Sequence, residues 1–239
     1  ATVVIPGDSG LERLERGAVS RDVVASETVT PARPGVVRRA PLPGARTVAL
    51  TFDDGPWPGQ TAGVLRVLES RSVPATFFML GSRVRMTPTL ARQVVQAGHV
   101  IGNHTYWHPH LDTLPPDRMD REIAATTAEI LTATGTRPAW LRPPAGRMDA
   151  RVSLAAERAG LRVALWTVDP QDWRDEMTAD EIVAHVTRAV RPGAIVVLHD
   201  GGGDQTETIR ALPRIIDALR AEGYEFVTLD DMERVRAKW

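Results

Sequence analysis

The chain has 239 residues, with 29 lysines and arginines against 30 aspartates and glutamates, and no cysteine. A net charge of −1 argues against the cationic surface that binds nucleic acid. Without cysteine there are no disulfides, thiolate metal sites or cysteine nucleophiles. Hydrophobic residues make up 43% and charged residues 25%, which predicts one globular core. The longest apolar runs, such as 194–198, are too short to span a membrane.

The first 45 residues differ in composition from the rest of the chain. They contain five prolines, which lack the N–H that a strand ladder needs. Two short valine-rich pieces, Val3–Ile5 and Val23–Val24, have the composition of an edge strand. We expect residues 1–45 to form an N-terminal arm with at most a short strand, and not an independent domain.

From Thr47 onward, predicted strands alternate with predicted helices. Runs of β-branched or aromatic residues predict strands at Thr47–Phe52, Ala75–Leu80, His99–Asn103, Ala139–Arg142, Arg162–Thr167, Ala194–His199 and Glu225–Leu229. Helical periodicity predicts helices at Gln60–Arg71, Pro88–Ala97, Pro115–Thr134, Ala150–Ala159, Thr178–Val190 and Thr206–Ala221. This alternation is typical of parallel βαβ units, which build either an open sheet or an incomplete barrel.

Polar residues distinguish these two arrangements, because they follow five different strands. They are Asp53 and Asp54, His104 and His108, Arg142, Asp169 and Asp172, and His199. All of them fall at the carboxyl ends of predicted strands, which share one face in a (β/α) barrel. In an open sheet, five strand ends would be too far apart for these side chains to converge. We therefore predict an incomplete α/β barrel of about seven parallel strands.

Two of these segments together predict a metal site. Alone, Asp53-Asp54-Gly55-Pro56 is typical of a polar turn. His104 and His108, however, are four residues apart, a spacing that would place both imidazoles on one side of a helical turn. Two histidines and one carboxylate, Asp54, form the ligand set of a catalytic divalent metal with an open position.

Two further segments carry acid–base chemistry. Arg142 precedes Pro143-Pro144-Ala145-Gly146, a stiff segment in which the arginine can hold a carboxylate through paired hydrogen bonds. Taken alone, it is also typical of a surface arginine. His199 ends a strand and Asp172 follows the adjacent one, which suits a proton donor and the carboxylate that tunes it.

These segments resemble the five ordered motifs of the polysaccharide deacetylases, the NodB-homology group of carbohydrate esterase family 4. The motifs are Thr51-Phe52-Asp53-Asp54-Gly55-Pro56, His104-Thr105-Tyr106-Trp107-His108, Arg142-Pro143-Pro144-Ala145-Gly146, Asp169-Pro170-Gln171-Asp172-Trp173 and Leu198-His199. The resemblance implies a distorted (β/α) barrel over residues 46–231, with the arm before it and a short tail at 232–239.

The resemblance also implies roles at the catalytic centre. Asp53 would be the general base, oriented by Arg142. Asp54, His104 and His108 would bind one divalent metal ion. Zinc is the expected metal, with cobalt, manganese and nickel as alternatives.

In the same way, the resemblance implies a proton donor and an acetyl pocket. His199 would be the general acid, tuned by Asp172, and Trp173 and Leu198 would wall the pocket. Ala145 occupies a position where the family commonly has tyrosine. The role of that position in holding an oxyanion depends on its backbone N–H, which alanine keeps, so the departure bears on the shape of the substrate groove.

The expected function is metal-dependent removal of acetyl groups, foremost N-acetyl groups of a GlcNAc-containing polysaccharide such as chitin oligomers or peptidoglycan. Tyr106 and Trp107 could stack on sugar rings or simply pack at the barrel rim. The alternatives are an O-acetyl esterase acting on acetylxylan, a small-molecule deacetylase or deformylase, and a non-catalytic carbohydrate-binding domain. We expect a monomer that binds acetylated carbohydrate and does not bind nucleic acid. Such substrates imply a secreted or envelope-facing protein, although the first residues show no signal peptide.

Overall fold

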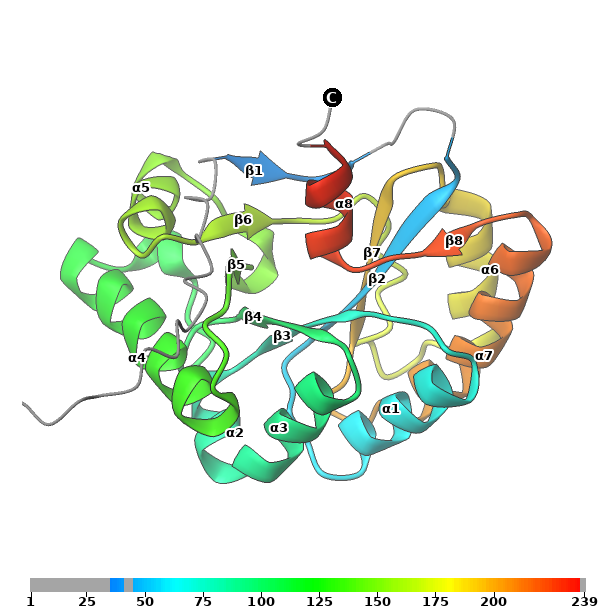
Figure 1. The fold of residues 1–239 in the computed structure, drawn as a ribbon, viewed down its shortest axis with the longest axis horizontal. Helices are drawn as coiled ribbons and strands as arrows, with labels where there is room; N and C mark the ends of the chain where they lie inside the picture. Colours follow the sequence, from blue (N-terminus) through cyan, green and yellow to red (C-terminus); the bar gives the residue numbers. More distant parts are fainter. Residues whose placement is uncertain (1–34, 41–44, 237–239) are drawn as a thin grey trace, which may run out of the picture. The chain divides into compact units, whose positions relative to one another are not determined.

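The computed structural model describes residues 35–40 and 45–236 (Figure 1). The expected strand pieces Val3–Ile5 and Val23–Val24 lie outside the described residues. Eight strands form one sheet. They are β1 (Val36–Val37), β2 (Thr47–Asp53), β3 (Thr76–Met79), β4 (Val100–Asn103), β5 (Trp140–Leu141), β6 (Arg162–Ala164), β7 (Ala194–His199) and β8 (Glu225–Phe226). All seven predicted strands are therefore present. β1 is an additional strand, and it is too short for its hydrophobic residues to show a recognisable alternation.

The sheet is a distorted, incomplete barrel. Its strands run in the order β1-β6-β5-β4-β3-β2-β7, β8 pairs with β2, and every ladder is parallel. After β6 the chain continues to Val168, which forms a parallel bridge with Val196 of β7. Arg39, which follows β1, forms a second, antiparallel bridge with Ala194 of β7. These two isolated bridges join the two sides of the curled sheet, which confirms the predicted incomplete barrel.

Most of the helices cover the outer side of the curved sheet, whereas the last one packs against its inner side (Figure 1). They are α1 (Gln60–Ser70), α2 (Gly81–Met86), α3 (Pro88–Gln96), α4 (Pro116–Thr134), α5 (Ala150–Arg158), α6 (Ala179–Ala189), α7 (Thr206–Ala221) and α8 (Leu229–Arg236). Short 3₁₀ turns lie at Leu111–Thr113 and Pro144–Gly146. The six predicted helices are all present. In the described part of the chain, no helix is long and apolar enough to cross a bilayer.

Two helices were not expected, α2 and α8. The strand predicted over Glu225–Leu229 ends at Phe226, and Leu229 instead begins α8. Leu229 and Met232 are buried against the strands in a cluster with Ala49 and Trp140, and the indole N–H of Trp140 donates to Asp230 at 2.7 Å. This packing, which is invisible in the local sequence, makes a helix of residues that look like the end of a strand.

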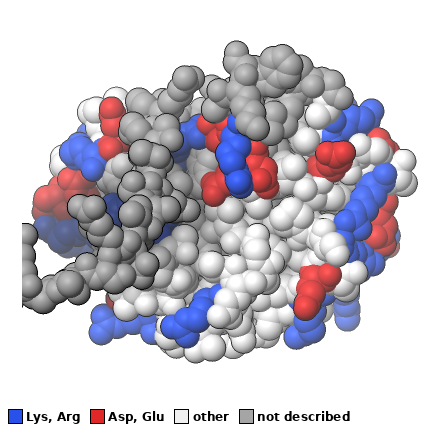
Figure 2. Space-filling view, viewed as in Figure 1, with Lys and Arg blue, Asp and Glu red and all other residues white. Residues whose placement is uncertain are grey.

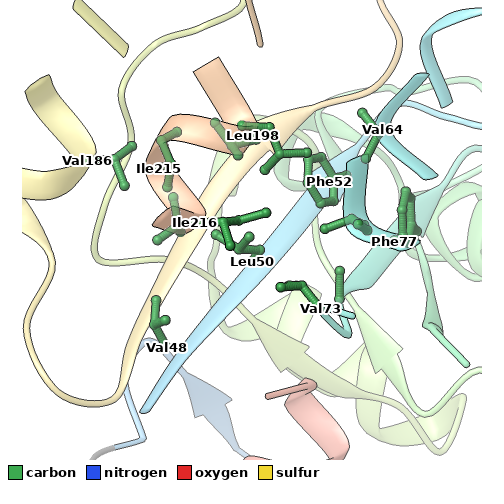
Figure 3. Close-up of a cluster of buried hydrophobic side chains, with 14 of the residues drawn as sticks. Val48, Leu50, Phe52, Val64, Val73, Phe77, Val186, Leu198, Ile215 and Ile216 are labelled. Carbon is green, nitrogen blue, oxygen red and sulfur yellow. The ribbon is translucent and has the colours of Figure 1, made fainter. Parts of the chain in front are cut away.

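The alternation of side chains along β2 and β7 determines which side chains point to the inner face of the sheet and which point to the outer helices. Leu50, Phe52 and Leu198 are fully buried in the core between the sheet and the outer helices (Figure 3). Burying a side chain such as Phe52 stabilises the fold by about 1.5–3 kcal/mol. Successive residues of a strand point to opposite faces, so Asp53 and His199 point the other way. These two residues are also paired in register across β2 and β7.

The face of the molecule drawn in Figure 2 shows no dominant charge. On the face seen in Figure 2, acidic and basic side chains lie intermingled, and no broad patch of one sign forms there. This distribution agrees with the near-neutral balance of the sequence.

Candidate active site

A cavity of about 350 Å³ opens at the carboxyl ends of the strands. It is lined by Asp53, Asp54, His104, His108, Ala145, Trp166, Asp169, Trp173, Val197 and His199. Residues from β2 and β7 and from the loops after β4, β5 and β6 thus converge, as the barrel predicted. This is the face where the loops of a parallel barrel build active sites.

Asp54, His104 and His108 form a group that can hold a metal ion. The Oδ1 atom of Asp54 lies 3.5 Å from Nε2 of His104 and 3.3 Å from Nε2 of His108. Tetrahedral coordination with bonds of about 2.0–2.1 Å requires ligand atoms about 3.3 Å apart. This Oδ1 is also buried without a hydrogen-bond partner. An orphaned carboxylate oxygen facing two imidazole nitrogens fits a divalent cation.

The tautomer of His104 suits a metal ligand. Its Nδ1 lies 2.7 Å from the carbonyl oxygen of Arg142, and a carbonyl can only accept, so Nδ1 carries the hydrogen and Nε2 is left with a lone pair. Burial lowers the pKa of His104 to about 3, although the charge of Asp54 opposes this shift. The ring is therefore neutral and ready to donate a lone pair at ordinary pH.

The two histidines do not lie on a helical turn, contrary to the prediction from their spacing. Residues 104–109 form a loop without helical structure. Thr105 and His108 have φ values of 70° and 64°, in the left-handed region. These two backbone reversals turn both imidazoles toward Asp54, so the two histidines meet through the loop conformation and not through the helical spacing on which their pairing was predicted.

Asp53 is held by a buried arginine. Nη1 of Arg142 donates to Oδ1 of Asp53 at 2.7 Å and to the hydroxyl of Thr51 at 2.8 Å. The guanidinium is fully buried and lies 4.1 Å from the ring centroid of Phe78. Burial lowers the pKa of Arg142, and the adjacent charge of Asp53 opposes that shift. Removing either partner would leave a buried charge unpaired, which typically costs about 3–5 kcal/mol.

His199 and Asp172 form the second buried pair. Nδ1 of His199 lies 2.7 Å from Oδ1 of Asp172, whose Oδ2 accepts from the Thr208 hydroxyl at 2.8 Å. Burial alone would lower the pKa of His199. The hydrogen bond and charge of Asp172, together with Asp53 and Asp54, outweigh it and raise the pKa to about 9. At neutral pH the imidazole therefore carries a proton.

The expected pocket residues divide into two groups. Ala145 and Trp173 line the cavity, whereas Leu198 is packed in the core and Val197 lines the cavity in its place. Tyr106 and Trp107 are not among the lining residues, and the Trp107 side chain is 72% exposed. The aromatic residues nearest the reacting groups are thus those that follow β6.

Sequence reasoning missed Trp166 and Asp200. Trp166 lines the cavity, and a β-carbon on Gly146 would approach its ring to 2.8 Å. Asp200 is fully buried and accepts from the backbone N–H of Gly55 at 3.1 Å and from the Thr61 hydroxyl at 2.6 Å. Burial raises the pKa of Asp200 to about 7. Its place directly after His199, at the end of β7, was the available signal.

Known proteins share this arrangement. The polysaccharide deacetylase family matches residues 42–164. A peptidoglycan-N-acetylglucosamine deacetylase of Bacillus cereus is 37% identical over 193 residues, covering 80% of this chain and 90% of that protein. A chitooligosaccharide deacetylase of Bradyrhizobium is 39% identical over 201 residues, covering 79% of this chain and 91% of that protein.

Solved structures have the same fold. The Bc1960 peptidoglycan N-acetylglucosamine deacetylase superposes with a TM-score of 0.79 at 34% identity, covering 82% of this chain and 92% of that one. A family 4 pseudoenzyme of Bacillus anthracis, BA3943, superposes with a TM-score of 0.78 at 30% identity, covering 84% and 69%. The matched profile and these relatives show that the chain belongs to the polysaccharide deacetylase family, carbohydrate esterase family 4.

Proposed function

We propose that this protein hydrolyses the N-acetyl groups of GlcNAc residues in a polysaccharide, either chitin oligomers or peptidoglycan. One observation carries the proposal: the Asp54–His104–His108 group opens into the same cavity as Asp53 and His199. The relatives that act on peptidoglycan and on chitooligosaccharides support the choice of substrate.

Zinc is the metal we propose for Asp54, His104 and His108. Two imidazoles and one carboxylate with an open position are a common zinc set in hydrolases, and the spacing of the donor atoms suits tetrahedral geometry. A divalent ion held there supplies Lewis acidity, because it polarises a carbonyl oxygen and makes water more acidic. Cobalt, manganese and nickel accept the same donors.

Asp53 is proposed as the general base. Arg142 occupies its Oδ1, and its Oδ2 lies 3.8 Å from Nε2 of His104, so the carboxylate is directed toward the metal ligands. The hydrogen bond from Arg142 fixes the orientation of the carboxylate, so that its other oxygen can accept a proton from water. A positioned base of this kind contributes about 10²–10⁴ to the rate.

His199 is proposed as the general acid. Its ring carries a proton at neutral pH because Asp172 stabilises the imidazolium. Asp53 and His199 come from adjacent strands in register, so one cavity holds both a proton acceptor and a proton donor. The imidazolium would protonate the leaving amine as the carbon–nitrogen bond breaks.

The remaining roles concern the acetyl group. We propose that the backbone N–H of Ala145 holds the carbonyl oxygen as it becomes an oxyanion, and that Trp173 walls the acetyl pocket. Both residues line the cavity. We propose that the protein acts as a monomer. Peptidoglycan and chitin lie outside the cytoplasm, so we propose a secreted or envelope-facing location.

Acetate release tests the function directly. The zinc-loaded protein is incubated with chitin oligomers, peptidoglycan and acetylxylan, and acetate is measured beside the Asp53→Asn variant. We expect release from the two GlcNAc substrates and a loss of about 10²–10⁴ in the variant, with zinc retained. Release from acetylxylan alone would make the protein an O-acetyl esterase. No release from any of them would favour a small-molecule substrate or a non-catalytic domain, the condition that the BA3943 pseudoenzyme exemplifies.

A further inference from the structure

The loop that carries both histidine ligands has no helical hydrogen bonds of its own, so other groups must hold its shape. Its four amides from Thr105 to His108 all donate to side chains. Thr105 N–H donates to Oδ1 of Asn103 at 2.9 Å, and His108 N–H donates to the Thr105 hydroxyl at 3.1 Å. These two bonds are local, within five residues of the chain.

The other two amides depend on one distant residue, Glu122. Its Oε2 accepts from the N–H of Tyr106 at 2.8 Å and from the N–H of Trp107 at 2.9 Å. Hydrogen bonds to a carboxylate are about twice as strong as those between neutral groups. Glu122 therefore connects the two middle amides of the loop to α4, whereas the carbonyls of Thr105 and Tyr106 accept from the N–H groups of Gly81 and Ser82.

The backbone of Glu122 belongs to a helix that is anchored in the core. Glu122 lies on α4 between Met119 and Ile123, which are fully buried, and its backbone carbonyl accepts from the Thr126 hydroxyl at 2.9 Å. On the other side, the loop carbonyl of Thr105 accepts from Gly81 N–H at the start of α2. The loop is thus clamped between α2 and the carboxylate of α4.

We infer that Glu122 is a positioning residue for the metal site, which fixes the loop so that His104 and His108 reach the same ion as Asp54. His104 has a second restraint, its Nδ1 bond to Arg142. His108 has a side chain that is 40% exposed and depends on the loop conformation. Glu122 lies outside all five motifs of the family resemblance. The inference rests on the proposed metal site.

Zinc affinity of the purified, metal-free protein, measured by competition with a chromogenic chelator, tests this role. Removing a group that orients metal ligands typically weakens binding by about 10–100-fold, which we expect for Glu122→Ala. Glu122→Gln keeps an acceptor oxygen at the same reach and should retain affinity within a few-fold. Glu129→Ala is the matched control, because Glu129 lies on the same helix and, among the described residues, forms an ion pair with Arg85 and not with the loop.

The outcomes separate this inference from the proposed metal site. If the wild-type protein binds no stoichiometric zinc, or if His104→Ala binds it equally well, the metal site itself is wrong. If those controls pass and a folded Glu122→Ala binds zinc as tightly as wild type, Glu122 only stabilises the fold and the inference is overturned. An equal loss in Glu122→Gln would also overturn it, because charge and not loop geometry would then matter.

A second variant keeps the test decisive if Glu122→Ala does not fold. Glu122→Asp keeps the charge and withdraws the oxygens by one methylene, so it cannot reach both amides in the present geometry. We expect zinc binding weaker than in wild type and Glu122→Gln. Wild-type affinity in a folded Glu122→Asp would overturn the inference.

Discussion

Asp172 holds His199 through both of its carboxylate oxygens. Oδ1 accepts from the ring Nδ1 at 2.7 Å, and Oδ2 accepts from the backbone N–H of the same histidine at 2.9 Å. The first bond fixes the protonation of the ring and the second fixes the strand end that carries it. Asp172, a single residue in the loop that follows β6, thus controls both the charge and the position of the proposed acid.

This pair predicts a pH effect with a definite sign. The pKa of His199 is raised to about 9 by Asp172 against the effect of burial. In Asp172→Asn the negative charge is lost, the imidazolium is less stable, and the pKa falls. The acid therefore loses its proton at lower pH, and the basic limb of the pH–rate profile should move toward neutrality. A basic limb at the wild-type position would mean that another group, and not His199, titrates there.

A second prediction concerns Asp54 and stability. Its Oδ1 is buried without a partner in the absence of metal, a condition that costs about 1–3 kcal/mol or more for a charged group. Asn tolerates the left-handed φ of 76° found here. We expect Asp54→Asn to unfold at no lower a temperature than the metal-free wild type.

The same variant should lose its response to zinc. A ligand present at 100 times its Kd stabilises the folded state by about 2.7 kcal/mol, so zinc should raise the Tm of wild type and not that of Asp54→Asn. Thermal melts with and without zinc measure both effects. A wild-type shift in the variant would remove Asp54 from the ligand set.

Apart from the short helix α2, the order of elements from Thr47 to Ala221 was predictable, because apolar periodicity and glycine stops mark it locally. Gly135, for example, ends α4 with a φ of 74°, as its place after a helical pattern predicts. The convergence of Asp53, His104 and His199 was also predictable, since parallel strands end on one face of a barrel. α8 was not predictable, because tertiary burial of Leu229 and Met232 determines it.

The candidate site shows where motif reasoning fails. Leu198 was expected to wall the pocket, but it is packed in the core. Side chains alternate along a strand, so His199 and Val197 point into the cavity and Leu198, which lies between them, points away from it. That argument was available in the sequence.

The shape of the loop at 104–109 could not be predicted from the sequence, because two of its amides bind Glu122, a helical residue more than ten positions away.

His99 predicts a loss of stability in acid. The ring is buried, its Nδ1 accepts from the N–H of Ala75 at 3.2 Å, and burial lowers its pKa to about 4 from 6.5. Below pH 6.5 the unfolded chain binds a proton that the folded chain does not. The stabilisation from a neutral His99 is therefore complete above pH 6.5 and is lost as pH falls toward 4.

The variant His99→Asn isolates this effect, because its Oδ1 can accept from Ala75 N–H and does not titrate. Urea unfolding at several pH values between 7 and 5 measures the free energy of unfolding. This free energy should fall more steeply with decreasing pH in the wild type than in the variant. A pKa lowered from 6.5 to about 4 corresponds to about 3 kcal/mol at most. Parallel curves for the two proteins would show that His99 is not neutral in the folded state or is not buried as described.

The last prediction contrasts two neighbouring residues, Ala145 and Gly146, which have φ values of 55° and 63°. At Ala145 the left-handed conformation is unfavourable for a β-carbon by about 1–2 kcal/mol, so Ala145→Gly should be neutral or stabilising. Its N–H is unchanged, and turnover should stay close to wild type. Proline is unusable as a test there, because its φ of about −65° is incompatible with this loop.

Gly146→Ala should have the opposite effect. A β-carbon there would lie 2.8 Å from the ring of Trp166, which must then move within the cavity lining. A displacement of about 1 Å at a reacting centre can cost about 10²-fold in rate, so we expect a fall of that order in kcat/KM on chitin oligomers with zinc content unchanged. Acetate release from the folded, zinc-loaded variants measures the contrast. If Gly146→Ala kept wild-type kcat/KM while Ala145→Gly lost it, the side chain of Ala145 and not its backbone would matter, and the oxyanion role proposed for its N–H would fail.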